Sequence, residues 1–265
     1  MQSKANMHPS VFENKEAADC LVPMGVTSEN VAARFGITRE MQDKLAVDSH
    51  KKAAHAQKQG WFKSEITPYH TWIKDKDGNM KQVLVDQDDG IRAQTTMESL
   101  GKLKPVFVKE NGTTTAGNSS QITDGAACVL LTTRKKAREM GAKILGRYLS
   151  FAAAGVPPEI MGIGPAVAIP AALKKAGLEV NDIDVFEINE AFASQATYCV
   201  EHLKIPKEKV NPRGGAIALG HPLGMTGARM IVTLMAELER TGKKRGLVSM
   251  CIGTGMGACG VFERE

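Results

Sequence analysis

Two glycine-rich segments near the C-terminal end of the chain each carry one side chain that can move a proton. The first is NPRGGAIALGHPLGMTGAR, residues 211–229, where seven positions are Gly or Pro and His221 is the only imidazole. Glycine and proline at this density clear side chains from a loop and let its backbone approach a ligand. A lone His is usually structural or on the surface, but its setting in this loop favours a general base. We interpret His221 as functional.

The second segment, CIGTGMGACG at residues 251–260, places Cys251 at the end of an apolar run and follows it with glycines, among them Gly253. A thiol at a strand end beside such a turn is exposed enough to react and has backbone N–H groups nearby to hold an oxyanion. The alternative is a buried cysteine in a hairpin, the usual fate of this residue type. That alternative is our expectation for the other cysteines, Cys20, Cys128, Cys199 and Cys259.

Between these segments, FEINEAFASQA at residues 186–196 places Asn189 and Glu190 after an apolar strand and before a helix. Helix capping is a fair alternative role for Asn189. In open α/β sheets, however, the position beyond the carboxyl end of a strand is where ligands bind. Asn189 is therefore a third candidate for the site.

The candidate residues lie in the most regular part of the chain, about residues 143–265. Short hydrophobic strands alternate there with helices, which predicts a layered α/β domain with helices on both faces of a mixed sheet. The predicted strands are Ile144–Ala153, Asp184–Ile188, Gly246–Ile252 and Gly260–Phe262, and the predicted helices are Pro165–Ala176 (closed by Gly177), Ala191–Leu203 and Thr226–Arg240.

The preceding residues have weaker patterns. Residues 1 to about 115 predict a loop-rich α+β region, with helices at Ser28–Phe35 and Arg39–Gln59 and strand-like segments at Glu65–Trp72 and Lys81–Val85. A second zone follows, in which a Gly- and Ser-rich turn leads into the apolar run Ala126–Leu131 and a basic helix, Arg134–Met140. An apolar run followed by a helix predicts a buried parallel strand.

Composition excludes several classes of protein. The 265 residues carry 34 basic and 29 acidic side chains, net +5, with 43% hydrophobic residues, as in ordinary soluble globular chains. Five scattered cysteines without CxxC spacing argue against a disulfide framework and a zinc site, and favour a reducing compartment. No run reaches the roughly 20 apolar residues of a membrane span, and neither a secretory signal nor an SKL-type address is visible. Basic clusters without a motif give no support for nucleic-acid binding.

With GHPLG, NEAFA and CIGTGMG in this order and spacing, the sequence resembles the thiolase family, most closely the peroxisomal-type 3-ketoacyl-CoA thiolases. The resemblance extends over MGVTSENVAARFGITREMQD, DDGIRAQTTMESLGKLKPVF and TTAGNSSQITDGAA. It implies an α/β thiolase-like layered fold, α/β/α/β/α in the complete family, with an incomplete first half here. The implied domains are a partial loop domain at 1–117, the last strand and helix of the N-terminal half at 118–142, and a complete C-terminal domain at 143–265.

The resemblance implies an acyltransferase of lipid metabolism. Thiolases cleave a 3-ketoacyl-CoA with coenzyme A in fatty-acid β-oxidation, giving acetyl-CoA and a shortened acyl-CoA through a covalent acyl-enzyme. Carried onto this chain, His221 looks like the base that activates the nucleophilic thiol, and Cys251 like the acid/base at the acetyl-CoA α-carbon. Asn189 would hold the water that completes an oxyanion hole with His221, and the N–H of Gly253 would serve a second hole.

Contacts to coenzyme A are carried over in the same way. Arg92 resembles the contact to the adenine and phosphate end, Ser99 and Ser120 resemble serines that meet the pantetheine, and Phe107 and Phe192 resemble apolar walls of its tunnel. The family implies CoA and acyl-CoA as substrates, with no permanently bound cofactor and no metal. It also implies a peroxisomal location, although a cytoplasmic one is expected if Met1 is the natural start.

One departure from the family concerns the nucleophile. Thiolases carry it in an N-terminal CxSG-type segment, and no such segment occurs in these 265 residues. We therefore expect this chain alone to be inactive, and residues 118–142 to cause poor solubility or oligomerisation. The alternatives are a non-catalytic thiolase-like protein that binds acyl-CoA or pairs with a full-length thiolase, and a biosynthetic acetoacetyl-CoA thiolase. The sequence leaves the oligomeric state open, and a homo-oligomer is one possibility.

Overall fold

A four-stranded mixed sheet lies at the centre of the computed structural model, which describes residues 7–265. Its order is β3-β6-β5-β4, where β3 is Gly146–Gly155, β4 Val185–Ile188, β5 Arg245–Ile252 and β6 Met256–Arg264. The β3–β6 and β6–β5 pairs are antiparallel and the β5–β4 pair is parallel. This confirms the predicted mixed sheet.

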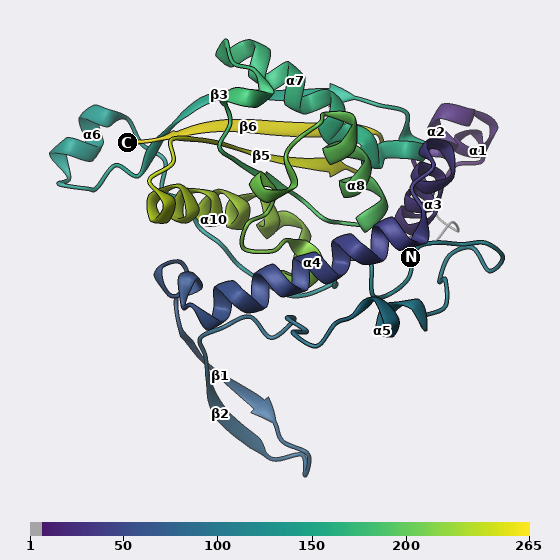
Figure 1. The fold of residues 1–265 in the computed structure, drawn as a ribbon, viewed down its shortest axis with the longest axis horizontal. Coiled ribbons are helices and arrows are strands. Elements are labelled where there is room, and N and C mark those ends of the chain that lie inside the picture. The colour runs from purple at the N-terminus through teal and green to yellow at the C-terminus, as the bar shows by residue number, and fades with distance from the viewer. Residues whose placement is uncertain (1–6) are drawn as a thin grey trace.

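Helices cover both faces of this sheet (Figure 1), as predicted. On one face, Ile169 and Leu173 of α7 (Gly164–Ala176) pack in a buried cluster that also contains Val200 of α8 (Ala193–His202). On the other face, α10 (Thr226–Thr241) packs Met230 and Leu234 in a second buried cluster. Because successive side chains of a strand point to opposite faces, the strands contribute to both clusters. The fold is therefore a layered α/β arrangement.

The N-terminal helices pack against this α/β domain. The long helix α4 (Arg39–Lys58) is capped by Thr38, whose side chain accepts a hydrogen bond from the N–H of Met41. One face of α4 contacts α8 and α9 (Ala216–Leu219), and Ala46 and Val47 are buried there. The remaining helices of this region are α1 (Ser10–Glu13), α2 (Lys15–Asp19), α3 (Met24–Phe35) and α5 (Met97–Gly101). Residues 1–6 of the predicted domain 1–117 lie outside the described residues.

A two-stranded antiparallel hairpin, β1 (Tyr69–Lys74) and β2 (Met80–Val85), projects away from the rest of the chain (Figure 1). It corresponds to the two strand-like segments expected from the sequence. Short 3-10 turns connect other elements, at Trp61–Ser64, Pro158–Ile163, Val180–Asp182, Lys207–Lys209 and Leu223–Met225. Within residues 7–265, no helix combines the length and apolarity needed to cross a bilayer.

One predicted strand is wrong. Residues 126–131 form no strand, and Leu130 and Leu131 are 75% and 78% exposed. A strand needs a hydrogen-bonding partner, and no strand of the described chain pairs with this run. The helix expected after it is present as α6 (Arg134–Glu139). Strand β6, in contrast, is longer than the predicted Gly260–Phe262, because pairing with both β3 and β5 supports its glycine-rich start.

Candidate active site

Asn189 directly follows β4 and is held by the sheet. Its N–H donates to the carbonyl of Ser249 on β5 at 2.9 Å, and its own carbonyl accepts from Nε2 of Gln195 at 2.9 Å. The side chain of Asn189 does not cap α8, because the N-cap position is Phe192, which makes no side-chain cap hydrogen bond. Asn189 is buried. The capping alternative is therefore excluded.

His221 lies beside Asn189. Its Nε2 is 3.4 Å from Nδ2 of Asn189, and its Nδ1 is 2.7 Å from Oγ1 of Thr226. The backbone N–H of His221 donates to the backbone carbonyl of Gln121 at 2.9 Å. The neighbouring Gly220 has φ +91°, and a Cβ on it would lie 2.5 Å from the Thr123 hydroxyl oxygen. The glycine is required, since only it permits so close an approach with this backbone conformation.

Buried polar contacts hold the glycine-rich loop in place. The carboxylate of Glu190 accepts from the Ser49 hydroxyl at 2.6 Å and from Nδ2 of Asn211 at 2.7 Å. Arg213, almost fully buried, donates to Glu237 on α10 at 2.9 Å and to Glu65 at 3.3 Å. These contacts tie the start of the loop to three other parts of the chain. Sequence reasoning noted Glu190 but not Arg213, although both lie within the motifs.

The surroundings of His221 favour its neutral form. Burial, and after it the positive charge of Arg229, lowers the pKa of the imidazole. Nη1 of Arg229 lies 3.5 Å from Oε2 of Glu187, a fully buried carboxyl whose pKa burial raises to about 8 despite the arginine. The neutral imidazole has a free lone pair on one nitrogen, as a general base requires.

Cys251 lies near the end of β5 and pairs with Gly257 of β6. The residue is half-buried, and burial raises the pKa of its thiol to about 12. At neutral pH the thiol is therefore protonated and can donate a proton. A Cβ on Gly257, the strand partner of Cys251, would lie 2.1 Å from the carbonyl oxygen of Gly164. The backbone of β6 at Gly257 is therefore in close contact with the start of α7. Gly253, in the turn after Cys251, has open space on the side where a Cβ would lie.

The other cysteines meet the expectation of burial only in part. Cys199 and Cys259 are buried, as expected, and burial raises the pKa of both thiols. Cys20 is half-buried, with Sγ 3.7 Å from the carbonyl oxygen of Thr254. The expectation was wrong for Cys128, which is exposed because residues 126–131 form no strand that would bury it.

Three of the five residues expected to contact coenzyme A lie together. The rings of Phe107 and Phe192 meet edge to face, with centroids 6.4 Å apart. The backbone N–H of Ser120 donates to the carbonyl of Ala191 at 2.9 Å. This bond places Ser120 next to the short segment that contains Asn189 and Phe192. Two apolar rings and a serine thus lie together on segments around Phe192, three residues after Asn189, and this mixture suits an amide-bearing alkyl chain.

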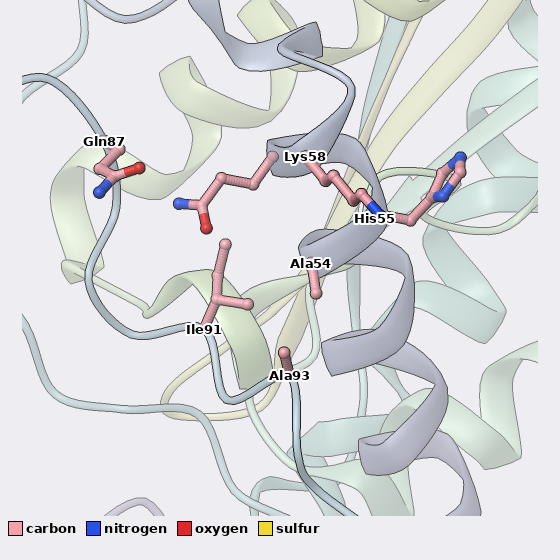
Figure 2. A pocket seen from close by; sticks show the side chains of 7 residues that line it. Ala54, His55, Lys58, Gln87, Ile91 and Ala93 are labelled. Carbon is pink, nitrogen blue, oxygen red and sulfur yellow. The ribbon is translucent and has the colours of Figure 1, made fainter.

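The other two lie on exposed segments. Ser99 closes a capping box with Thr96 at the start of α5. Nη1 of Arg92 donates to the carbonyl of Asp89 at 2.7 Å. The backbone N–H of Arg92 donates to Nδ1 of His50 at 3.1 Å. The two neighbours of Arg92, Ile91 and Ala93, line a cavity of about 510 Å³ (Figure 2). Within the described residues, neither Arg92 nor Ser99 forms a hydrogen bond with Asn189 or His221, so their contacts to coenzyme A stay predictions.

The cavity beside Arg92 lies between α4 and the chain at 87–93 (Figure 2). A second cavity of about 370 Å³ is lined mainly by residues of α4 and α8, among them Ser49 and Thr197. Within residues 7–265, no three or more His, Cys, Asp or Glu side chains are grouped in a way that could hold a metal ion.

Comparison with protein-family models gives matches over both parts of the chain. Residues 1–135 match the model described as "Thiolase, N-terminal domain", and residues 142–264 match "Thiolase, C-terminal domain". The chain is 64% identical over 259 residues to "3-ketoacyl-CoA thiolase B, peroxisomal" of Rattus norvegicus, covering 97% of this chain and 61% of the relative. It is 62% identical over 259 residues to "3-ketoacyl-CoA thiolase, peroxisomal" of Homo sapiens, with the same two shares.

Among solved structures, the dimeric peroxisomal thiolase of Saccharomyces cerevisiae matches with a TM-score of 0.89 and 53% identity, covering 97% of this chain and 63% of that one. The human mitochondrial 3-ketoacyl-CoA thiolase matches with a TM-score of 0.84 and 40% identity, covering 92% and 60%. The chain thus spans about 61% of the length of the curated relatives given above.

Proposed function

The chain belongs to the thiolase family, and from this premise we propose that its site carries out the acid–base steps of a peroxisomal 3-ketoacyl-CoA thiolase, an acetyl-CoA C-acyltransferase of fatty-acid β-oxidation. The observation that carries the proposal is the contact of Asn189 with His221, at 3.4 Å, beside β5, which carries Cys251 near its end. An amide, an imidazole and a thiol are the groups needed to hold an oxyanion and move protons in thioester chemistry.

In the proposed reaction, a nucleophilic thiol attacks the 3-keto carbon and the C2–C3 bond breaks. The bonding electron pair goes to C2, and the Cys251 thiol gives its proton there to form acetyl-CoA. His221 takes the proton of the attacking thiol, and its Nε2 together with a water held by Asn189 stabilises the oxyanion. In the second half, the thiol of coenzyme A gives its proton to the Cys251 thiolate and its sulfur attacks the thioester. The acyl group moves to coenzyme A, and the released nucleophile takes the proton back from His221.

The acyl-accepting thiol is the one member of this set that the 265 residues do not supply in a Cys-x-Ser-Gly segment. In other enzymes, loss of one member of a catalytic set that acts as a unit costs up to about 10⁶ in rate. We propose that the chain as given binds CoA and acyl-CoA but does not complete thiolysis. Arg92, Ser99, Ser120, Phe107 and Phe192 are the proposed contacts to the CoA moiety.

The proposed domain division follows the family. Residues 1–117 would be part of the loop domain, 118–142 the end of the N-terminal half, and 143–265 the C-terminal domain. The peroxisome is the proposed location, because the names of both relatives describe them as peroxisomal.

One partial reaction tests the proposal in the chain as given, because it needs Cys251 and the water held by Asn189 but not the nucleophile. The Cys251 thiolate removes an α-proton of acetyl-CoA, the site holds the enolate, and the thiol returns a deuteron from D₂O. We expect the protein to speed loss of the acetyl methyl signal in proton NMR above the buffer rate, and Cys251→Ala to abolish the effect. Cys128→Ala, at an exposed thiol, is the matched control and should change nothing.

Exchange at the buffer rate, with acetyl-CoA bound, would contradict the proposed role of Cys251. A second experiment joins the family's Cys-x-Ser-Gly segment to the N-terminus and measures thiolysis of acetoacetyl-CoA. Activity of that fusion, lost in its Cys251→Ala variant, is the expected result.

The exposed apolar run gives specific support to a second function, a non-catalytic subunit that pairs with a full-length thiolase. Leu130 and Leu131 have no cover in the described chain, and their segment has no strand partner. Co-purification with a complete thiolase, together with CoA affinity and no proton exchange, would favour this function over the first.

A further inference from the structure

Thr226 is the residue that completes the surroundings of the His221 ring. It is fully buried, begins α10 and places its hydroxyl oxygen 2.7 Å from Nδ1, although it lies five residues after His221. The chain returns to the ring through the 3-10 turn Leu223–Met225, in which Leu223 has φ +35°. The two ring nitrogens thus face two different side chains, Asn189 at Nε2 and Thr226 at Nδ1.

The hydrogen-bonding chemistry of these two partners determines which ring nitrogen of His221 carries the proton. In the structure Nδ2 of Asn189, which can only donate, faces Nε2, and this contact is a hydrogen bond only when Nε2 is the acceptor and carries no proton in the neutral ring. In that arrangement the single ring proton is on Nδ1, and the hydroxyl oxygen of Thr226, 2.7 Å away, is placed to accept it. The protonated nitrogen of a histidine is decided in this way by the hydrogen bonds that the ring makes.

We propose that Thr226 is a positioning residue that holds His221 in the Nδ1-protonated tautomer, so that the lone pair of Nε2 faces the reacting groups. The inference rests on the proposed function for its consequence, because a base must present a bare nitrogen to the thiol that it deprotonates. After accepting that proton, Nε2–H becomes a donor to the oxyanion while Nδ1–H stays bonded to Thr226.

A hydroxyl suits this task differently from the carboxylate of a Ser-His-Asp triad, which orients the ring and also stabilises its positive form. Thr226 supplies orientation without a negative charge. Thr226 begins α10, so the His221 ring lies at the positive end of that helix dipole. This position and the positive charge of the nearby Arg229 both disfavour a protonated His221. The arrangement keeps the resting imidazole neutral, and only then does its tautomer decide whether it can act as a base.

The test uses the chain with ¹⁵N-labelled histidine and reads the ring nitrogens by NMR. Six histidines are present, and a His221→Asn variant identifies the signal of His221. We expect a protonated Nδ1 and a bare Nε2 at pH 8. Thr226→Val keeps the branched shape but removes the hydroxyl, and should move the ring to a mixture or to the Nε2–H tautomer. Thr226→Ser should restore the original tautomer.

Thr197→Val is the matched control, because Thr197 is also a buried threonine and its hydroxyl has no hydrogen-bond partner. It should leave the His221 signals unchanged. In acetoacetyl-CoA thiolysis by the fusion that carries the Cys-x-Ser-Gly segment, where His221 must deprotonate the added thiol, Thr226→Val should lower the rate at saturating substrate by about 10-fold or more without raising KM.

An Nε2–H ring in the unmodified protein would overturn the inference, as would an unchanged tautomer in a folded Thr226→Val variant. If that variant does not fold, the tautomer of the unmodified protein and of Thr226→Ser still decides. The proposed function fails separately: absence of proton exchange, in a protein whose His221 shows the expected tautomer, counts against the reaction and not against the role of Thr226.

Discussion

Nδ2 of Asn189 lies 3.4 Å from Nε2 of His221, although 32 positions separate the two residues. The strand end that carries Asn189 and the loop that carries His221 are joined by a buried carboxylate, since Glu190 bonds to Asn211 at the start of that loop. The geometry of the site therefore depends also on buried polar groups outside the Asn189–His221 pair.

Replacing Asn189 by Ala removes the amide that faces His221 and that would hold the oxyanion water. Loss of one donor to an oxyanion lowers rates by about 10²–10³ in other enzymes. We expect a loss of about 10² in acetyl-CoA proton exchange, with acetyl-CoA affinity unchanged. Asn181→Ala, at an exposed position in a 3-10 turn, is the control. An unchanged rate in Asn189→Ala would remove this residue from the proposed mechanism.

Proton exchange should depend steeply on pH. The pKa of the Cys251 thiol is raised to about 12, so the group is protonated at neutral pH and its thiolate fraction grows as pH rises. For a single base below its pKa, the exchange rate should increase about tenfold per pH unit. The lowered pKa of His221 places its own titration below the range from pH 8 to 10.

The measurement is the exchange rate between pH 8 and 10, corrected for the buffer reaction. A plateau below pH 9 would show that the base is a group other than a buried Cys251 thiol.

Arg213→Met should destabilise the fold strongly. The guanidinium is buried between Glu65 and Glu237, at 3.3 and 2.9 Å, and also donates to the carbonyl of Trp61 at 2.9 Å. Removing one partner from a buried ion pair leaves an uncompensated charge and costs about 3–5 kcal/mol. We expect a decrease of this size in the free energy of unfolding, measured by urea denaturation.

Arg147→Met is the control for that experiment, since Arg147 pairs with Glu263 at 2.6 Å but more than half of its side chain is exposed. Exposed pairs contribute about 0–1 kcal/mol. Equal losses in the two variants would mean that the Arg213 cluster adds nothing beyond an ordinary surface pair.

The elements around the site could be predicted because their signals are local. The helix α7 ends at Gly177, as the sequence indicates, since glycine adopts its φ of +67° without strain. The glycine-rich segments likewise made His221 and Cys251 candidates, and only the second of these segments follows an apolar strand. Asn189 and Cys251 lie at the same edge of the sheet because β4 and β5 are parallel neighbours, whereas His221 reaches Asn189 from a loop.

What the sequence did not reveal depends on partners far along the chain. The apolar run 126–131 has strand composition, but a strand forms only where another strand pairs with it. The role of Thr226 was missed because a threonine at a helix start is ordinary; its spacing of five residues from His221 was the available signal. Arg213 was missed because its two carboxylate partners come from Glu65 and α10.

The exposed run in residues 118–142 should make the chain self-associate. Ile122, Leu130 and Leu131 are 99%, 75% and 78% exposed, and the backbone around the two leucines has no strand partner in the described chain. Uncovered apolar side chains on an extended segment invite pairing with a second chain. The double variant Leu130→Ser, Leu131→Ser should therefore lower the mass measured by light scattering at a given concentration. Tyr69→Ser, at an exposed aromatic of the hairpin, is the control and should not. A monomer at every concentration in the unmodified chain would show that this run stays solvated without a partner.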